Sequence, residues 1–165
     1  MARVTYEPIG IIHTPFKEKA ETPIQGIFDR DSRGEVEVFP QYREGLKDID
    51  AFSHLILIYH FHLAEGYSLI TRPFLDNEGK GIFSIRHFNR PNPIGISVVR
   101  LHQVKGNILT IGEVDILDGT LLLDIKPYVP DFDIRQDVRK GWYEHARNIS
   151  QYERNKGRPK RPKGF

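Results

Sequence analysis

The stretch that decides the fold is residues 90–117, RPNPIGISVVRLHQVKGNILTIGEVDIL. Two prolines among its first four residues fix their own φ angles and favour extended backbone at the residues before them, which excludes a helix there. Apolar segments follow at 96–105 and 108–117, and Gly106–Asn107 between them is typical of a tight hairpin turn. The stretch therefore predicts a rigid polar loop, or a plain proline-rich connector, that leads into two antiparallel core strands.

Further strands are expected on both sides of this stretch. Residues 6–14 are apolar and β-branched, and residues 34–39 alternate polar and apolar side chains, as a half-buried strand does. Residues 52–63 are the most hydrophobic run, and their length suits a long core strand. Residues 82–85 and 121–125 predict two shorter strands.

Helical signals are few. Residues 40–50 are polar enough for a short surface helix or loop, and Trp142, Ala146 and Ile149 fall at helical spacing near the C-terminus. Many short strands with a single late helix predict a mainly β protein. We expect a small closed or nearly closed β-barrel with peripheral short helices and one C-terminal helix.

Composition indicates a soluble globular protein of one domain, because 39% of the 165 residues are hydrophobic and charge is mixed. We expect a barrel domain over residues 1–153 and a basic, flexible tail over residues 154–165. The tail holds six of the 24 Lys and Arg residues and no acid. Such a tail suits a polyanionic partner, or it simply keeps the chain in solution.

Several classes of chemistry are excluded. The chain has no cysteine, so it has no disulfide, thiolate metal site or cysteine nucleophile, and it has no glycine-rich phosphate loop. His54, His60 and His62 share one face of the expected strand, but no acidic residue falls inside that run. We therefore expect no metal, and interpret these residues as core or pocket histidines.

The N-terminus lacks an apolar signal region, and no window is long enough to span a membrane. We expect a cytoplasmic protein without a membrane partner. The long loops at 64–81 and 129–141 are candidate lids or interface elements.

Polar segments at the ends of predicted strands are the candidates for a site. Four segments of this kind lie at residues 14–26, 60–62, 90–95 and 118–128. The motifs at residues 9–17, 52–55, 90–95 and 118–128 resemble those of the TsaA-like family, whose characterised branch is the TrmO-type tRNA methyltransferases. The resemblance implies a small β-barrel that binds S-adenosylmethionine, works as a homodimer and methylates N6 of threonylcarbamoyladenosine, next to the anticodon of certain tRNAs.

The resemblance also implies which residues bind the cofactor: Gln25, Gly26, Ile27, Phe61, His62, Arg90, Leu101, Asp118, Gly119, Thr120 and Leu121. Phe88 and Asn92 are added from their positions in the sequence. A guanidinium such as that of Arg90 pairs bidentately with a carboxylate or a phosphate. The backbone at Gly26 offers a ligand close approach, and Phe61 and His62 are suited to stack on adenine and attract the sulfonium.

Methyl transfer requires the nucleophile, methyl and sulfur in line. Asp124 is the candidate general base, with Asp118 beside it, although proton loss to solvent would also serve. Arg86, Lys126 and Tyr128 are candidates for the threonyl carboxylate or a tRNA phosphate.

Two alternatives from the residues remain: a non-catalytic nucleotide- or RNA-binding barrel, and a histidine-dependent metalloenzyme. Relatives that methylate tRNA often carry a further C-terminal domain. The basic tail is a candidate to replace part of that domain's contact with tRNA, or else this shorter form acts on a different nucleoside.

Overall fold

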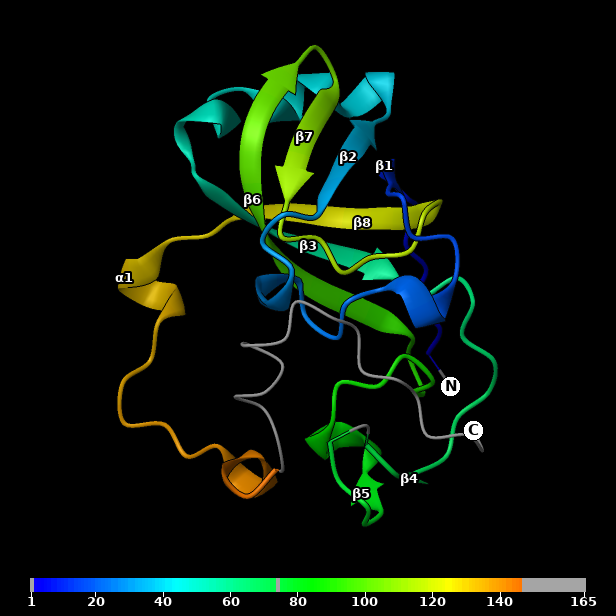
Figure 1. Cartoon of the computed structure of the whole chain (residues 1–165). Helices are drawn as coiled ribbons and strands as arrows, with labels where there is room; N and C mark the ends of the chain where they lie inside the picture. Colours follow the sequence, from blue (N-terminus) through cyan, green and yellow to red (C-terminus); the bar gives the residue numbers. More distant parts are fainter. Residues whose placement is uncertain (1, 74, 147–165) are drawn as a thin grey trace. The chain divides into compact units, whose positions relative to one another are not determined.

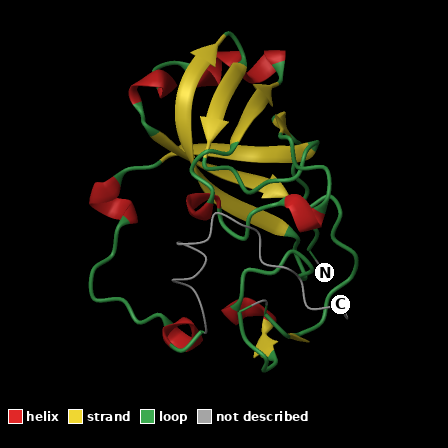
Figure 2. Cartoon of the chain, in the orientation of Figure 1, coloured by secondary structure: helices red, strands yellow, loops and turns green. Residues whose placement is uncertain are grey.

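The computed structural model describes residues 2–73 and 75–146, and its main element is a closed antiparallel β-barrel (Figures 1 and 2). The barrel order is β1-β2-β7-β6-β3-β8, and its strands are β1 (Gly10–His13), β2 (Arg33–Val38), β3 (His54–His60), β6 (Ile94–Lys105), β7 (Ile108–Gly112) and β8 (Thr120–Pro127). The expected mainly β barrel is thus confirmed, and β6 and β7 form the hairpin predicted around Gly106–Asn107.

Alternation of side chains along each strand fills the barrel. In β3, Leu55, Leu57 and Tyr59 are buried, while the residues between them are half-buried. They pack with Ile12 of β1 and Val99 of β6 in one hydrophobic core. Because side chains of a strand point alternately to its two faces, this pattern places one full set of apolar groups inside the barrel.

The chain divides into two compact units. Of the described residues, the barrel unit holds 2–62 and 94–128. It also holds the 3-10 helices η1 (Lys19–Glu21), η2 (Gly26–Phe28), η3 (Pro40–Leu46) and η4 (Ile49–Ala51).

Of the described residues, the second unit holds 63–73, 75–93 and 129–146. Its elements are β4 (Ile70–Thr71), β5 (Lys80–Gly81), η5 (Ile82–Ser84), α1 (Pro130–Asp133) and η6 (Gly141–Glu144). Among the described residues, no helix is both long and apolar enough to cross a membrane. The single domain over 1–153 stays a prediction, and the tail at 154–165 lies outside the described residues.

The strand expected at residues 82–85 is wrong. Ile82–Ser84 forms a 3-10 turn, in which the Ser84 hydroxyl donates to the Gly81 carbonyl at 2.8 Å. Ile82 and Ile85 are buried whereas Phe83 is exposed, so this short apolar run supplies two buried anchors but pairs with no neighbouring strand among the described residues.

In the part of the expected C-terminal helix that the structure describes, Gly141–Glu144 forms a 3-10 turn and no α-helix is present. The turn begins at Gly141 in the left-handed region (φ 58°). The Trp142 indole N–H donates to the Ser84 carbonyl at 2.8 Å, which fixes the turn to η5 within the second unit. Ile149, which completed the predicted helical spacing, lies outside the described residues.

Truncating the barrel core should destabilise the protein strongly. Leu57 is 0% exposed, so Leu57→Ala should lower the free energy of unfolding by about 2–5 kcal/mol through lost burial and a cavity. The matched control is Leu69→Ala, since Leu69 is 60% exposed and its truncation should change that free energy by less than about 0.5 kcal/mol. Urea unfolding measures both, and equal losses would contradict the proposed core.

Candidate functional site

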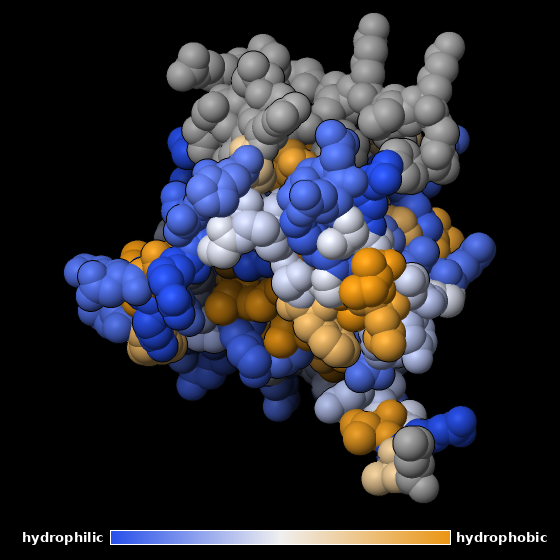
Figure 3. Space-filling view, turned by 90° about the horizontal axis from the view of Figure 1, so that it is seen from below, coloured by the Kyte–Doolittle hydropathy of each residue, from blue (hydrophilic) through white to orange (hydrophobic). Residues whose placement is uncertain are grey.

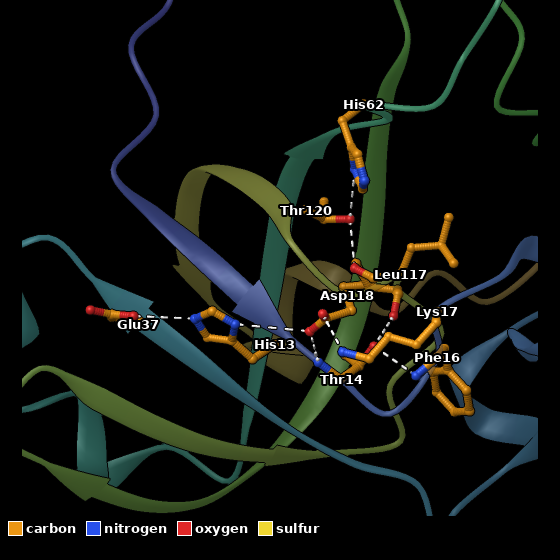
Figure 4. Close-up of polar contacts among 10 residues, drawn as sticks. His13, Thr14, Phe16, Lys17, Glu37, His62, Leu117, Asp118 and Thr120 are labelled. Atoms are coloured by element: carbon orange, nitrogen blue, oxygen red, sulfur yellow. Dashed lines mark hydrogen bonds and ion pairs between the residues drawn. The ribbon is translucent and has the colours of Figure 1, made fainter.

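Residues 113–119, here called the rim segment, connect β7 to β8 and are tied to the chain that follows β1 (Figure 4). The Thr14 hydroxyl donates to the Ile116 carbonyl at 2.7 Å, and the Thr14 amide donates to Asp118 Oδ1 at 3.0 Å. The Asp118 amide in turn donates to the Phe16 carbonyl at 2.9 Å. These bonds fix the Asp118–Gly119 turn beside residues 14–16.

Two further hydrogen bonds hold the middle of the rim segment. The Val114 amide donates to the Ser32 hydroxyl at 2.8 Å, and the Ser97 hydroxyl donates to Asp115 Oδ1 at 2.5 Å. Because Ser97 gives its single proton to that carboxylate, the buried Tyr59 hydroxyl, 2.9 Å away, donates to Ser97. The interior of the barrel is thereby linked to its rim.

Asp118 carries the negative charge of the site (Figure 4). Lys17 Nζ donates to Asp118 Oδ2, and His13 Nδ1 lies 3.9 Å from Asp118 Oδ1. The other ring nitrogen of His13 lies 3.2 Å from Glu37 Oε2. The Lys17 ammonium, aided by the Thr14 amide, lowers the pKa of Asp118 against a smaller opposing effect of burial. Asp118 is therefore an anion at neutral pH, and within the protein it is paired with Lys17.

His62 lies at the same rim. Burial lowers its pKa, the nearby His60 and Lys19 lower it further, and a smaller effect of Asp118 opposes them, so the neutral ring is favoured at neutral pH. Thr120 Oγ1 lies 3.2 Å from His62 Nδ1 and donates to the Leu117 carbonyl at 2.7 Å. Since the threonine proton goes to Leu117, His62 Nδ1 must carry the donor hydrogen, which leaves Nε2 as an acceptor or base.

The segment Gln25–Ile27 packs on the other end of the rim segment. A Cβ on Gly26 would stand 1.7 Å from the Glu113 carbonyl oxygen, so the absent side chain makes room for protein backbone. The sequence interpretation took the missing side chain of Gly26 as room for a ligand. That reason is wrong, because Gly26 is itself buried. Ile27 beside it is exposed, so its side chain is accessible to a ligand.

Phe61, Leu101 and Leu121 belong to the barrel wall. The Phe61 ring packs edge-on against Tyr59 with centroids 5.4 Å apart, over Gly95. Leu101 packs against the core, and its amide donates to the Ser53 carbonyl at 2.8 Å. Leu121 pairs with Ile11 in the β1–β8 ladder.

The second unit holds Arg86, Phe88, Arg90 and Asn92. Arg90 NH1 donates to the Ile85 carbonyl at 3.3 Å, which supports the idea of a loop that holds its guanidinium still. The His87 and Phe88 rings are stacked with centroids 4.4 Å apart. Arg86 and Asn92 are exposed.

Asp124, Lys126 and Tyr128 lie along β8 and beyond its end, away from its first residue, Thr120. Asp124 is four positions from Thr120, roughly 13 Å along an extended strand, and pairs with Lys126 at 2.7 Å. Tyr128 packs edge-on against His54, with ring centroids 6.3 Å apart. The structure thus does not bring Asp124 to the Asp118 turn.

Asp124 instead lines a groove formed with η3 and η4. The other lining residues are Ile9, Val38, Gln41, Tyr42, Gly45, Leu46, Lys47, Asp48, Ile49, Phe52, Ile125 and Pro127.

Five residues that support the site were not among the sequence candidates: His13, Thr14, Lys17, Ser32 and Ser97. The first three fall inside the motif at residues 9–17, which was the available signal. Ser32 and Ser97 carry no local signal, because their partners lie far along the chain. Within the described part of the chain, no group of three or more His, Asp or Glu residues is placed to hold a metal ion.

Residues 11–134 match the family model described as the tRNA-methyltransferase O N-terminal domain. The chain belongs to this family. The family expected from the four motifs is therefore confirmed. The match spans the rim segment, Gln25–Ile27 and His62, so the clustered residues are part of the family's domain.

Relatives of this TrmO-family chain differ in length. It is 58% identical over 151 residues to a probable S-adenosyl-L-methionine-binding protein of Pyrococcus abyssi, covering 92% of this chain and 81% of the relative. It is 34% identical over 156 residues to the tRNA (adenine(37)-N6)-methyltransferase of Escherichia coli, covering 88% of this chain and 66% of that relative.

The crystal structure of TrmO from Pseudomonas aeruginosa matches with a TM-score of 0.74 at 37% identity, covering 87% of this chain. This chain spans 63% of the length of that solved chain.

The Lys17–Asp118 pair predicts a measurable titration. Lys17→Met should raise the pKa of Asp118 towards its ordinary value, because the main group that favours the carboxylate is removed. A ¹³C NMR titration of the carboxyl groups measures this change, with Lys47→Met on η3–η4 as the control that leaves Asp118 unchanged.

The sign of the effect on stability follows from the same shift. A carboxyl whose pKa is lower in the folded state contributes stability above its unfolded pKa, and loses it as the pH falls through the folded pKa. Lys17→Met should shrink this acid-dependent loss of stability. An unchanged Asp118 titration in the variant would contradict the pair.

Proposed function

We propose that this protein is an S-adenosylmethionine-dependent methyltransferase that acts on tRNA. The observation that carries the proposal is the family match over residues 11–134, which spans the segments gathered at the rim. The Escherichia coli relative is named a tRNA methyltransferase, and the Pyrococcus abyssi relative an S-adenosyl-L-methionine-binding protein. The proposed location is the cytoplasm, where tRNA is modified.

The residues present at the rim fit the cofactor by their chemistry. S-adenosylmethionine supplies an already activated methyl group, and offers an ammonium, a carboxylate and an adenine for recognition. Asp118 is the fixed anion for the ammonium, and His62 is a neutral ring with an acceptor nitrogen for the adenine. In this proposal Gln25–Ile27 contact the cofactor through backbone groups, and Phe61, Leu101 and Gly119–Leu121 make further contacts with it.

In this proposal Arg90 of the second unit binds the carboxylate of the cofactor. Phe88 and Asn92 make supporting contacts. Arg90 is held by backbone carbonyls, which leaves its remaining N–H groups for a bidentate partner. Arg86, Lys126 and Tyr128 are the proposed contacts for the RNA or the threonyl carboxylate.

The proposed acceptor is N6 of threonylcarbamoyladenosine next to the anticodon. Its lone pair is delocalised, so the protein contributes mainly by holding nucleophile and methyl in line. Loss of the proton to solvent suffices for this chemistry, and the position of Asp124 beside Lys126 gives it no contact with the Asp118 turn. The proposal therefore does not depend on Asp124 as a base.

Methyl transfer is tested by mass spectrometry of tRNA nucleosides after incubation with isotopically labelled S-adenosylmethionine. The wild type should label a modified adenosine, and Arg90→Ala should lower product formation about 100-fold or more by misplacing the cofactor. Arg43→Ala, which removes an exposed guanidinium of η3, is the matched control and should keep full activity.

Full activity of the Arg90→Ala variant would refute the role of Arg90. Tight tRNA binding by a wild type that neither binds the cofactor in calorimetry nor forms product would favour the non-catalytic RNA-binding barrel instead.

A homodimer is also part of the proposal, and the outer face of β6 is its proposed interface. Ile94, Ile96 and Val98 point outward and are all exposed, with Ile96 at 54%. They pair with residues of β3 that include the half-buried Ile56 and Ile58. Figure 3 shows apolar residues at the surface beside hydrophilic ones. A contiguous apolar face on a sheet suits burial against a second copy.

Placing a charge on this face should separate the subunits. Ile96→Lys should convert a dimer to a monomer in sedimentation velocity, because a lysine would be buried in an apolar interface. Leu69→Lys, at a comparably exposed leucine of the second unit, should leave the dimer intact. A dimer that persists in Ile96→Lys would exclude the β6 face, and a monomeric wild type would exclude the dimer.

A further inference from the structure

Two arginines face one another across the sheet at the end of β7. Arg33 of β2 and Arg100 of β6 both pair with Gly112 of β7. Directly paired residues on neighbouring antiparallel strands point to the same face of a sheet. Figure 1 shows β2, β7 and β6 side by side. The two guanidiniums therefore stand on the two sides of a residue that has no side chain.

His102 fills the space above that glycine. The ladder between β6 and β7 shifts register between Leu101 and Gln103, so His102 occupies a bulge. A Cβ on Gly112 would stand 2.4 Å from His102 Nε2 and 3.1 Å from Arg33 NH1. The glycine thus lets the imidazole and one guanidinium approach the same point of the sheet.

The charges around His102 are mostly positive. Burial, Arg33 of β2 and Arg100 of β6 lower its pKa, and Glu113 after β7 opposes them. Glu113 is 3.4 Å from Arg100 Nε, whereas Arg33 donates to the neutral carbonyls of Arg30 and Ser32. Three nitrogen groups packed this closely repel one another when charged, and an anion would relieve that repulsion.

We propose that Arg33, Arg100 and His102 form an anion site that takes a phosphate group of the RNA backbone. The proposal rests on the proposed function, because it assigns one contact of the tRNA substrate. Guanidiniums bind phosphate bidentately, and imidazolium adds a further donor. His102 takes up a proton as the phosphate binds.

The site adjoins the segment proposed to bind the cofactor. Glu113, which pairs with Arg100, has its backbone carbonyl against Gly26. A phosphate held by the two arginines would therefore lie next to Gln25–Ile27 along the rim. Such a contact positions the RNA and carries no base specificity.

Binding of a tRNA transcript, measured by fluorescence anisotropy over a range of salt, tests the assignment. Arg33→Ala and Arg100→Ala should each weaken binding roughly three- to tenfold and lower the slope of log K against log salt by about one. Lys105→Ala, at the far end of β6, is the matched control and should alter binding little. Calorimetry should show that all three variants bind S-adenosylmethionine as the wild type does.

An NMR titration of the histidines tests the site without RNA. In sodium sulfate the pKa of His102 should be higher than in sodium chloride of equal ionic strength, and this difference should vanish in the Arg33→Ala/Arg100→Ala double variant. Accordingly, lowering the pH from 7.5 to 6 should strengthen tRNA binding more in the wild type than in His102→Gln.

Each result decides a separate point. The RNA assignment would be overturned if both arginine variants bound tRNA with the affinity and salt slope of the wild type. It would also be overturned if the wild type bound no tRNA, even if the site bound free sulfate. An unchanged His102 titration in sulfate would overturn the anion site itself. Absence of methyl transfer together with the expected binding losses would contradict the proposed function and leave this site standing.

Discussion

Hydrogen bonds hold residues 113–119 against the end of the barrel. The other parts of the barrel's site are positioned relative to this segment. Thr14, Ser32 and Ser97 come from three different parts of the chain, and each binds this segment through its hydroxyl group. A connector between two strands is ordinarily the most variable part of a small barrel. Here its polar groups are satisfied from the barrel body, so Asp118 and Glu113 keep fixed places.

Fixed charge is the second consequence of this arrangement. Lys17 keeps Asp118 anionic, while burial keeps His62 neutral a short way along the same rim. An anion and a neutral acceptor side by side suit a ligand with an ammonium group and a heterocycle. On the other side of Glu113, Arg33 and Arg100 supply the positive charge that a nucleic acid requires. The rim segment thus separates surfaces suited to a small zwitterion and to a polyanion.

The sequence predicted the barrel well, because its signals are local. The length and hydrophobicity of residues 52–63 located β3, and the Gly106–Asn107 turn located the β6–β7 hairpin. Local signals failed at residues 82–85, where Ile82 and Ile85 are buried but the backbone forms a 3-10 turn. The charge pattern of the site was also missed, since Lys17 and Asp118 meet only through the closure of the barrel. Gly26 shows the same limit, because a glycine that accommodates backbone looks in sequence like one that admits a ligand.

The central claim, that the rim segment and its neighbours bind the cofactor, is tested most directly by titrating S-adenosylmethionine into ¹⁵N-labelled protein. The account predicts saturable shifts of the backbone amides of Gln25–Ile27, His62 and Asp118–Leu121, with little change at the Gly106–Asn107 turn. Shifts centred instead on the η3–η4 groove around Tyr42 and Phe52, or no saturable shift at all, would contradict it.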